Sequence, residues 1–279
     1  HAIQKNGLML DAEDGVHMCR PTLATDRLEE LPELDLCLLC VKSYDLPEVT
    51  ERLRSTITER TMILPLLNGV DIYERIRSVI ESGVVFPSCV YVGTHIEKPG
   101  TVRQRGGSCM IHFGNDPARP HVDPFLFTLM DESAIAYNWT DNPYTEIWGK
   151  FIFIAAFGMV TAASGKTLGE VRQSPELSAQ VNAIMNEIAE IARAKQVRLS
   201  PTIISDSFAK AGKFPFEAKT SFQRDYENMT KPDERDIFGG TIIRLGKQFG
   251  IRTDATDMIY ARLRSDKRDE DHRRHDHHR

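Results

Sequence analysis

One lysine stands where it could take part in proton transfer. Lys150 directly precedes ten apolar residues, Phe151 to Val160. This run is apolar on every side at helical period, so it predicts a helix buried within a protein, and it is shorter than the ~20 residues that cross a bilayer. The ammonium of Lys150 then either reaches the surface or lies in a wet site beside the core, where it could donate a proton. The apolar run alone favours the first position, with the ammonium of Lys150 at the surface.

Two further polar side chains follow apolar runs that we expect to be parallel strands. Lys42 comes directly after Leu34 to Val41, and Asn68 comes directly after Thr61 to Leu67. Open α/β sheets bind ligands at the carboxyl ends of their strands. A lysine there could meet a phosphate, and an asparagine could offer both a donor and an acceptor. Each residue also has an ordinary explanation, because Asn68-Gly69 is a favourable turn and Lys42 could simply be exposed.

A hydroxyl and a carboxylate lie near two expected helix starts in the second half of the chain. Thr220 or Ser221 can cap the helix that follows, and Glu234 falls in a first helical turn, where the helix dipole favours a negative charge. Both residues could equally hold a polar ligand. Their surroundings in the sequence leave the two roles open.

Neither cysteines nor histidines predict a metal centre. Cys37 and Cys40 lie in the expected strand Leu34 to Val41, where residues three apart point to opposite faces, and no second cysteine pair completes a zinc site. The last fifteen residues contain four histidines but no apolar residue. This composition predicts a disordered charged tail over residues 265–279 without a fixed metal site.

Composition restricts the class of protein further. The chain has 279 residues, of which 41% are hydrophobic and 27% are charged, as in globular proteins with up to two domains. Its net charge of −5 gives no reason to expect nucleic-acid binding. The first residues have no signal-peptide pattern, and the five scattered cysteines suit a reducing compartment. We therefore expect a cytoplasmic protein without a membrane-spanning segment.

Strands and helices alternate in the first half of the chain. Strands are expected at Leu34–Val41, Thr61–Leu67 and Val84–Val92, with helices between them at Asp45–Ile57 and Ile72–Ile80. Such alternation predicts right-handed βαβ units and a parallel sheet.

Shorter elements are expected around this sheet. The first seven residues end a helix, and a hairpin follows around Asp14-Gly15. Pro99–Arg103 and Ser108–Phe113, with Gly106-Gly107 between them, predict an antiparallel hairpin. A short helix at His121–Asp131 and a strand at Ala134–Trp139 complete the first half.

Only helices are expected beyond Pro143. They span Tyr144–Ser164, Pro175–Lys195, Pro201–Ala211, a short stretch near Ser221, Asp233–Phe249 and Ala255–Leu263. The expected organisation is an α/β domain over residues 1–142, an all-helical domain over residues 143–264, and the tail.

Five stretches, in this order, resemble the ketopantoate reductase (2-dehydropantoate 2-reductase) family. They are Asn6-Gly7-Leu8 with its hairpin, Leu38 to Tyr44, Leu66 to Val70, Trp148-Gly149-Lys150, and the region with Thr220 to Gln223, Pro232-Asp233-Glu234 and Arg244-Leu245-Gly246. The similarity runs from His1 to about Leu263. It implies a Rossmann-like domain that binds NADP, followed by an all-helical substrate domain.

The resemblance also implies roles for single residues. Lys150 matches the catalytic lysine, and Lys42, Asn68 and Glu234 match cofactor-binding positions. Asn68 and Ser221 match substrate-binding positions. Ser221 and Glu234 are one residue further apart than in the family pattern.

The sequence departs from the family in two places. The family begins with a strand, a G-x-G-x-x-G loop and a helix, and we expect that a unit of about 30 residues containing them precedes His1. Ile154 and Gly158 stand four and eight residues after Lys150, on the same helix face, where the family has asparagines that hold polar groups of the substrate. The identity of the substrate is therefore open.

The predicted function is NADPH-dependent reduction of a 2-keto acid, with ketopantoate as the first candidate. Lys150 would donate the proton and stabilise the developing alkoxide, and desolvation would lower its pKa enough to make the proton available. The alternatives are a related hydroxy acid dehydrogenase with another substrate and a non-catalytic homologue that binds a nucleotide or a partner. The sequence does not reveal the oligomeric state, although helical second domains of this kind often pair as homodimers.

Overall fold

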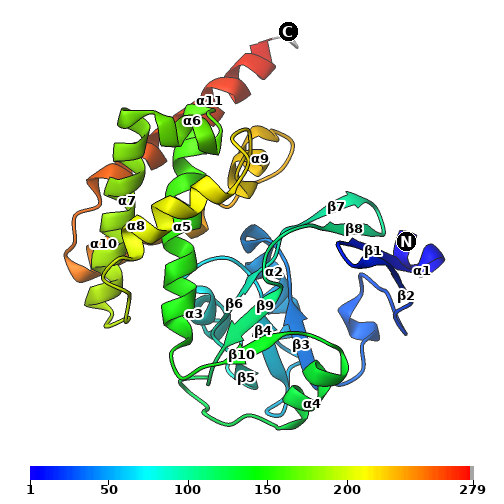
Figure 1. The fold of residues 1–279 in the computed structure, drawn as a ribbon. Coiled ribbons are helices and arrows are strands. Elements are labelled where there is room, and N and C mark those ends of the chain that lie inside the picture. The colour runs from blue at the N-terminus through cyan, green and yellow to red at the C-terminus, as the bar shows by residue number, and fades with distance from the viewer. Residues whose placement is uncertain (277–279) are drawn as a thin grey trace. The chain divides into compact units, whose positions relative to one another are not determined.

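The computed structural model describes the backbone of residues 1–276 and the side chains of residues 1–266. The chain forms two compact units. Unit 1 comprises His1–Val41, Asp45–Leu67 and Ile72–Pro143, and unit 2 comprises Lys42–Tyr44, Asn68–Asp71 and the chain from Tyr144 onward. Figure 1 shows the course of the chain through both. The loops with Lys42 and Asn68 thus group with the helical residues, although the sequence assigned them to residues 1–142.

A parallel sheet lies at the centre of unit 1. Strands β3 (Leu36–Leu39), β4 (Met62–Pro65) and β5 (Val84–Val85) are neighbours in that order, and both pairings are parallel. The connections contain the helices α2 (Leu46–Leu53) and α3 (Ile72–Arg77). This arrangement confirms the expected α/β class, because crossover connections through helices are what parallel strands require.

The predicted strand Val84–Val92 is two strands in different sheets. After β5, Phe86 still donates its amide to Ile63, but Pro87 has no amide hydrogen and the pairing stops. Strand β6 (Ser88–Tyr91) then pairs antiparallel with β9 (Met110–Phe113), and β10 (Tyr137–Trp139) pairs parallel with β9. Side chains from β4, β5, β9 and α4 (Phe125–Glu132) share one hydrophobic core, which includes Leu64, Phe86, Phe113 and Leu126.

The predicted hairpin after Gly93 has a different register. Strand β7 (Thr94–Lys98) pairs with β8 (Thr101–Gln104), so the turn is Pro99-Gly100, where Gly100 has φ of 83°. Gly106-Gly107 instead lies between β8 and β9, which belong to separate sheets. The sequence prediction was wrong because two turn-forming pairs lie seven residues apart, and only long-range pairing selects between them.

The expected first hairpin is present and belongs to the same sheet as β7 and β8. Helix α1 (Ala2–Asn6) ends at Gly7, and β1 (Leu8–Ala12) pairs antiparallel with β2 (Gly15–Cys19). Strand β1 also pairs parallel with β8, which gives the order β2-β1-β8-β7 seen in Figure 1. Two 3-10 turns, η1 (Leu28–Glu30) and η2 (Ser43–Asp45), flank β3.

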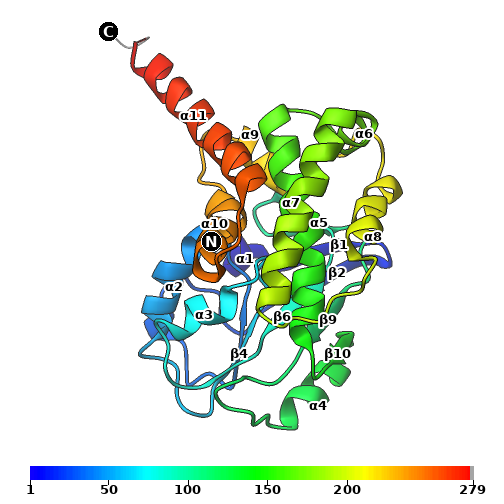
Figure 2. The ribbon, with the colours of Figure 1, turned by 90° about the vertical axis from the view of Figure 1, so that its left-hand side faces the viewer.

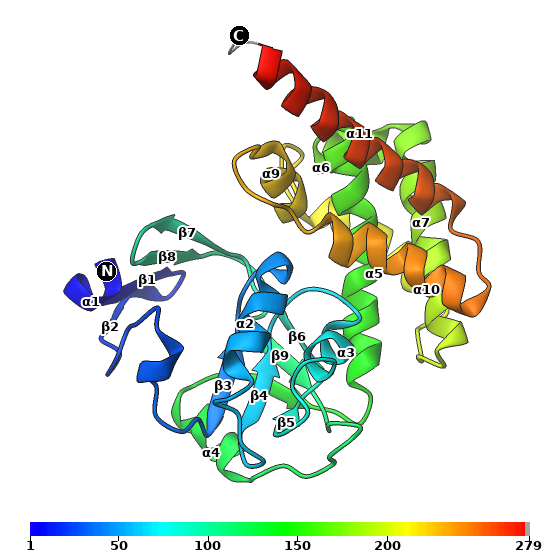
Figure 3. The same cartoon turned by 180° about the vertical axis from the view of Figure 1, so that it is seen from behind.

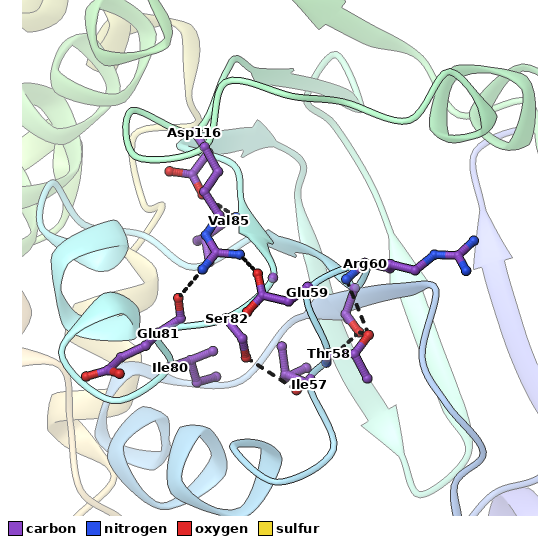
Figure 4. A network of polar contacts seen from close by, with 12 residues as sticks. Ile57, Thr58, Glu59, Arg60, Ile80, Glu81, Ser82, Val85 and Asp116 are labelled. Carbon is purple, nitrogen blue, oxygen red and sulfur yellow. Dashed lines mark hydrogen bonds and ion pairs between the residues drawn. The ribbon is translucent and has the colours of Figure 1, made fainter.

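A buried carboxylate connects helix α3, strand β5 and the loop after β9 in unit 1. Asp116 is 1% exposed and accepts hydrogen bonds from Tyr73 (2.6 Å), from the amides of Val85 and Ala118 (both 2.8 Å), and from the guanidinium of Arg77. Figure 4 shows Asp116 and Val85 together with the neighbouring contact between Ser82 and the carbonyl of Ile57 (3.3 Å).

Unit 2 is built from helices in its described residues beyond Pro143. They are α5 (Pro143–Ser164), α6 (Leu168–Gln173), α7 (Pro175–Ala194), α8 (Ile203–Lys210), the 3-10 turn η3 (Ala211–Lys213), α9 (Ser221–Glu227), the π-helical turn η4 (Asp236–Gly240), α10 (Thr241–Phe249) and α11 (Asp254–Asp276). Helix α6 leads into α7 (Figure 2), and α7 packs against α10 and α11 (Figure 3).

Three helix predictions need correction. Helix α6 was missed, although Thr167 and Glu170 form a full capping box at its start. The helix predicted at Asp233–Phe249 begins with the π-helical turn η4, in which Gly239 approaches Tyr260 so closely that a Cβ would lie 2.7 Å from its ring. Helix α11 continues to Asp276 instead of ending at Leu263, because no glycine or proline interrupts the charged sequence. This corrects the expected disorder for residues 265–276, and the last three tail residues lie outside the described ones.

Helix α5 is the core helix that the apolar run predicted. Among the described residues it is the one helix long and apolar enough to cross a membrane, but 72% of its most apolar window is buried inside the protein, as in the core helix of a soluble protein. Trp148, Phe151 and Ile152 are each no more than 1% exposed.

Candidate active site

The loop after β3 is fixed in unit 2 by two carboxylates. The Nζ atom of Lys42 lies 2.7 Å from Oδ2 of Asp225 on α9 and 3.6 Å from Oε1 of Glu234, just before η4. The amide of Ser43 donates to the other oxygen of Glu234 at 3.0 Å. Glu234 is 7% exposed, so its carboxylate is held by the protein itself.

The charges of this cluster decide what it can bind. Partial burial on its own would lower the pKa of Lys42, but the hydrogen bond to Asp225 and the negative charges of Glu234 and Asp225 together raise that pKa above its ordinary value. Lys42 therefore stays protonated at neutral pH, beside two carboxylates. Because a phosphate would be repelled by these carboxylates, the cluster suits a ligand with hydroxyl groups, which carboxylates can accept from.

Substitution of Glu234 tests this cluster through stability. We expect Glu234→Gln to lower the free energy of unfolding by about 1–3 kcal/mol, because the neutral amide removes the negative charge beside Lys42 and leaves one acceptor oxygen where two are used. Urea titration followed by circular dichroism measures the change. The matched control is Glu190→Gln, an exposed position on α7, which should change stability by less than about 0.5 kcal/mol. Equal effects of the two variants would contradict a structural role for the cluster.

The loop after β4 is held in a similar way. Asn68 is half-buried, Gly69 has φ of 134°, and Asp71 contacts α10. Oδ2 of Asp71 accepts from Thr241 at 3.2 Å and lies 3.8 Å from the guanidinium of Arg244. The sequence did not single out Asp71 or Asp225 as residues that hold these loops.

Lys150 and Ser221 lie on two helices that contact each other. Lys150 is half-buried on α5, between the buried Gly149 and Phe151. Ser221 is exposed at the first position of α9, and the helix cap is Thr220, whose hydroxyl accepts from the amide of Gln223 at 3.0 Å.

The contact between α5 and α9 is close on both sides of Ser221. The hydroxyls of Thr161 and Thr220 are 3.0 Å apart. A Cβ on Gly158 would lie 3.4 Å from Cβ of Phe222 and 3.6 Å from its ring, which is van der Waals contact, so Phe222 packs directly on α5 at residue 158. Helix α9 thus carries three relevant residues. They are Ser221, Phe222, which packs on α5, and Asp225, which binds Lys42. Two of the predicted site residues, Lys42 and Glu234, contact each other directly.

The cysteines have no such arrangement. All five thiols are free, and burial raises the pKa of both Cys37 and Cys40, so neither is an activated thiolate. Among the described residues, no group of three or more histidine, cysteine or acidic side chains could hold a metal ion.

Comparison with known proteins assigns the chain to a family. The family model described as ketopantoate reductase PanE/ApbA matches residues 1–117, and the model of its C-terminal part matches residues 142–267. The chain therefore belongs to the ketopantoate reductase family, a family of oxidoreductases. This confirms the resemblance seen in the sequence.

Individual relatives are distant but cover most of the chain. An uncharacterized oxidoreductase of Bacillus subtilis is 23% identical over 265 residues, 94% of this chain and 86% of the relative. A 2-dehydropantoate 2-reductase of Streptococcus pyogenes is 24% identical over 263 residues, 93% of this chain and 84% of the relative.

Solved structures share the fold. A PanE/ApbA family ketopantoate reductase from Ralstonia eutropha has a TM-score of 0.86 at 24% identity. The match covers 97% of this chain and 88% of the reductase. D-Mandelate dehydrogenase with NADH and anilino(oxo)acetate has a TM-score of 0.82 at 20% identity. The match covers 96% of this chain and 87% of the dehydrogenase. At these identities, both likenesses show that the fold is shared.

Proposed function

We propose that this protein is a cytoplasmic, nicotinamide-dinucleotide-dependent reductase that converts a 2-keto acid into the 2-hydroxy acid. The observation that carries the proposal is the position of Lys150, a half-buried lysine at the head of the buried helix α5, which α9 contacts next to Ser221. NADPH is the cofactor to test first, and a homodimer is the assembly to test, as in the dimeric ketopantoate reductase from Staphylococcus aureus, which shares the fold.

Three residues are proposed to hold the cofactor. Glu234 and Lys42 form a cluster that suits hydroxyl groups, so we assign them to a ribose of the dinucleotide rather than to a phosphate. Asn68, in the loop that Asp71 ties to α10, offers a donor and an acceptor and is assigned to both cofactor and substrate. When bound, the reduced nicotinamide supplies a hydride.

The chemical step that follows uses residues of unit 2. A hydride and a proton add across the ketone, and the carbonyl becomes a secondary alcohol. The ammonium of Lys150 gives the proton to the carbonyl oxygen and stabilises the charge that develops there, and it regains a proton from water afterwards. The hydroxyl of Ser221 binds a polar group of the keto acid. The hydride and the proton together account for the two hydrogen atoms that distinguish the alcohol from the ketone.

A second candidate is a hydroxy acid dehydrogenase of the same plan with a substrate other than ketopantoate. Ile154 and Gly158 favour it, because they stand where the family resemblance implies amides. The solved D-mandelate dehydrogenase shows that a fold neighbour acts on an aromatic hydroxy acid.

Cofactor consumption tests the proposal. The purified chain is incubated with NADPH or NADH and a panel of 2-keto acids that includes ketopantoate and phenylglyoxylate, the keto acid corresponding to mandelate. We expect consumption with at least one of them. Binding of the cofactor without consumption of any keto acid would favour a non-catalytic homologue.

A further inference from the structure

We propose that the substrate is a 2-keto acid whose side chain is branched or aromatic hydrocarbon without a hydroxyl group, and that Ile154, on the face of α5 that carries Lys150, contacts and selects this side chain. Ile154 and the buried residues Gly158 and Phe222 beyond it are called the apolar wall below. The inference rests on the proposed reductase activity and specifies its substrate class.

The helix face next to Lys150 has no group that could bind a hydroxyl. At 3.6 residues per turn, Lys150, Ile154 and Gly158 follow one another along one side of α5. None of the ten side chains from Phe151 to Val160 can donate or accept a normal hydrogen bond. Ile154 is half-buried, midway between Lys150 and Gly158, so its hydrocarbon is available for contact with a ligand bound at Lys150.

The first polar side chain further along this face is already used by the protein. Thr161 is fully buried, its hydroxyl donates to the carbonyl of Phe157 at 2.7 Å, and it lies 3.0 Å from the hydroxyl of Thr220. It therefore has no capacity to bind a substrate hydroxyl.

The far end of the apolar wall is closed by an aromatic ring. Phe222 is 3% exposed, and its ring stands edge to face against Phe238, with 5.4 Å between the ring centroids. Phe238 packs in turn on Phe151 of α5, at 6.0 Å. At Gly158 the backbone of α5 is in van der Waals contact with Phe222, so an apolar side chain and not a polar group covers this position.

These contacts predict how a hydroxyl on the substrate is treated. A hydroxyl against the apolar wall loses its hydrogen bonds to water and gains none, so it lowers kcat/KM. A site built to bind that hydroxyl would instead reject the analogue that lacks it. Which of the two substrates is preferred, the one with the hydroxyl or the one without it, therefore shows whether the apolar wall contacts this part of the substrate.

The test compares ketopantoate with trimethylpyruvate, which is ketopantoate without its hydroxyl group. We expect kcat/KM of the intact chain to be about 10–100-fold higher for trimethylpyruvate. Ile154→Asn should lower this ratio at least about tenfold, because an amide is then one helical turn from Lys150. The control Ile154→Leu should leave the ratio within about threefold of the original.

The outcomes separate the two proposals. Equal or better use of ketopantoate by the unsubstituted chain overturns the apolar wall and leaves the reductase activity in place. If no keto acid of the panel is reduced, the reductase proposal and this inference are both wrong. The ratio in the unsubstituted chain is decisive even if Ile154→Asn fails to fold.

Discussion

Lys150→Ala should reduce kcat by about 10²–10⁴-fold while the affinity for the reduced cofactor changes by less than about threefold. The factor is that of a general acid, and the variant also loses the positive charge beside the developing alkoxide. Steady-state kinetics on the best keto acid of the panel and fluorescence titration of NADPH measure the two quantities separately. Turnover close to that of the original chain would remove Lys150 from the mechanism.

Two further substitutions show which property of Lys150 matters. Lys150→Arg keeps the positive charge, but a guanidinium does not release its proton at neutral pH, so kcat should stay low. Lys247→Ala removes an exposed lysine from α10 and should leave kcat unchanged. If Lys150→Arg were as active as the original chain, charge alone and not proton donation would explain the role of Lys150.

Asp116→Ala should destabilise unit 1 by about 3–5 kcal/mol. Four hydrogen bonds end on this carboxylate, and its removal leaves the guanidinium of Arg77, whose side chain is 14% exposed, without its charged partner. Arg77 also donates to the carbonyls of Ser82 (3.0 Å) and Gly83 (2.9 Å), so the loop before β5 would lose its support.

Tryptophan fluorescence can measure this effect on unit 1 alone. The chain has two tryptophans, and Trp139 packs on Phe86 and Phe113 in the core of unit 1. In a Trp148→Phe background, the urea-induced change in fluorescence therefore reports on that core. The control Glu132→Gln, at an exposed residue of α4, should shift the transition by less than about 0.5 kcal/mol. A similarly small shift for Asp116→Ala would contradict the role of the carboxylate.

The same network predicts a dependence on pH. Burial on its own would raise the pKa of Asp116, but the hydrogen bonds from Tyr73, from the amides of Val85 and Ala118 and from Arg77 together hold it below its usual value. A depressed pKa in the folded state contributes stability above the pKa of the unfolded chain. That contribution should be lost as the pH falls below about 4, and Asp116→Ala should lack this part of the acid destabilisation.

The sequence predicted the elements that depend on local patterns. The apolar runs before Lys42 and Asn68 are parallel strands, and the run after Lys150 is a buried helix. The sequence prediction failed where pairing between distant strands decides the structure. The choice between Pro99-Gly100 and Gly106-Gly107 as the hairpin turn depends on which strands meet in the fold, and α11 continues because helix ends without stop residues are weakly marked.

The candidate site was predictable where its residues follow an expected strand, begin an expected helix or lie in a family motif. Lys42 and Glu234 were singled out in this way, and the fold brings them together. Asp225 lies 183 residues from Lys42 and belongs to no motif, so its contact could not be read from spacing. We assign the cluster to hydroxyl groups, in place of the phosphate expected for Lys42, because the fold brings two carboxylates to the same lysine.

Transfer of deuterium tests the central claim most directly. The chain is incubated with the best keto acid of the panel and with NADPH or NADH that carries deuterium at the reactive position of the nicotinamide, and the product is examined by mass spectrometry and NMR. A 2-keto acid reductase yields the 2-hydroxy acid with one deuterium on the carbinol carbon, formed as a single enantiomer. Unchanged keto acid, or a product without deuterium on that carbon, would contradict the proposed function.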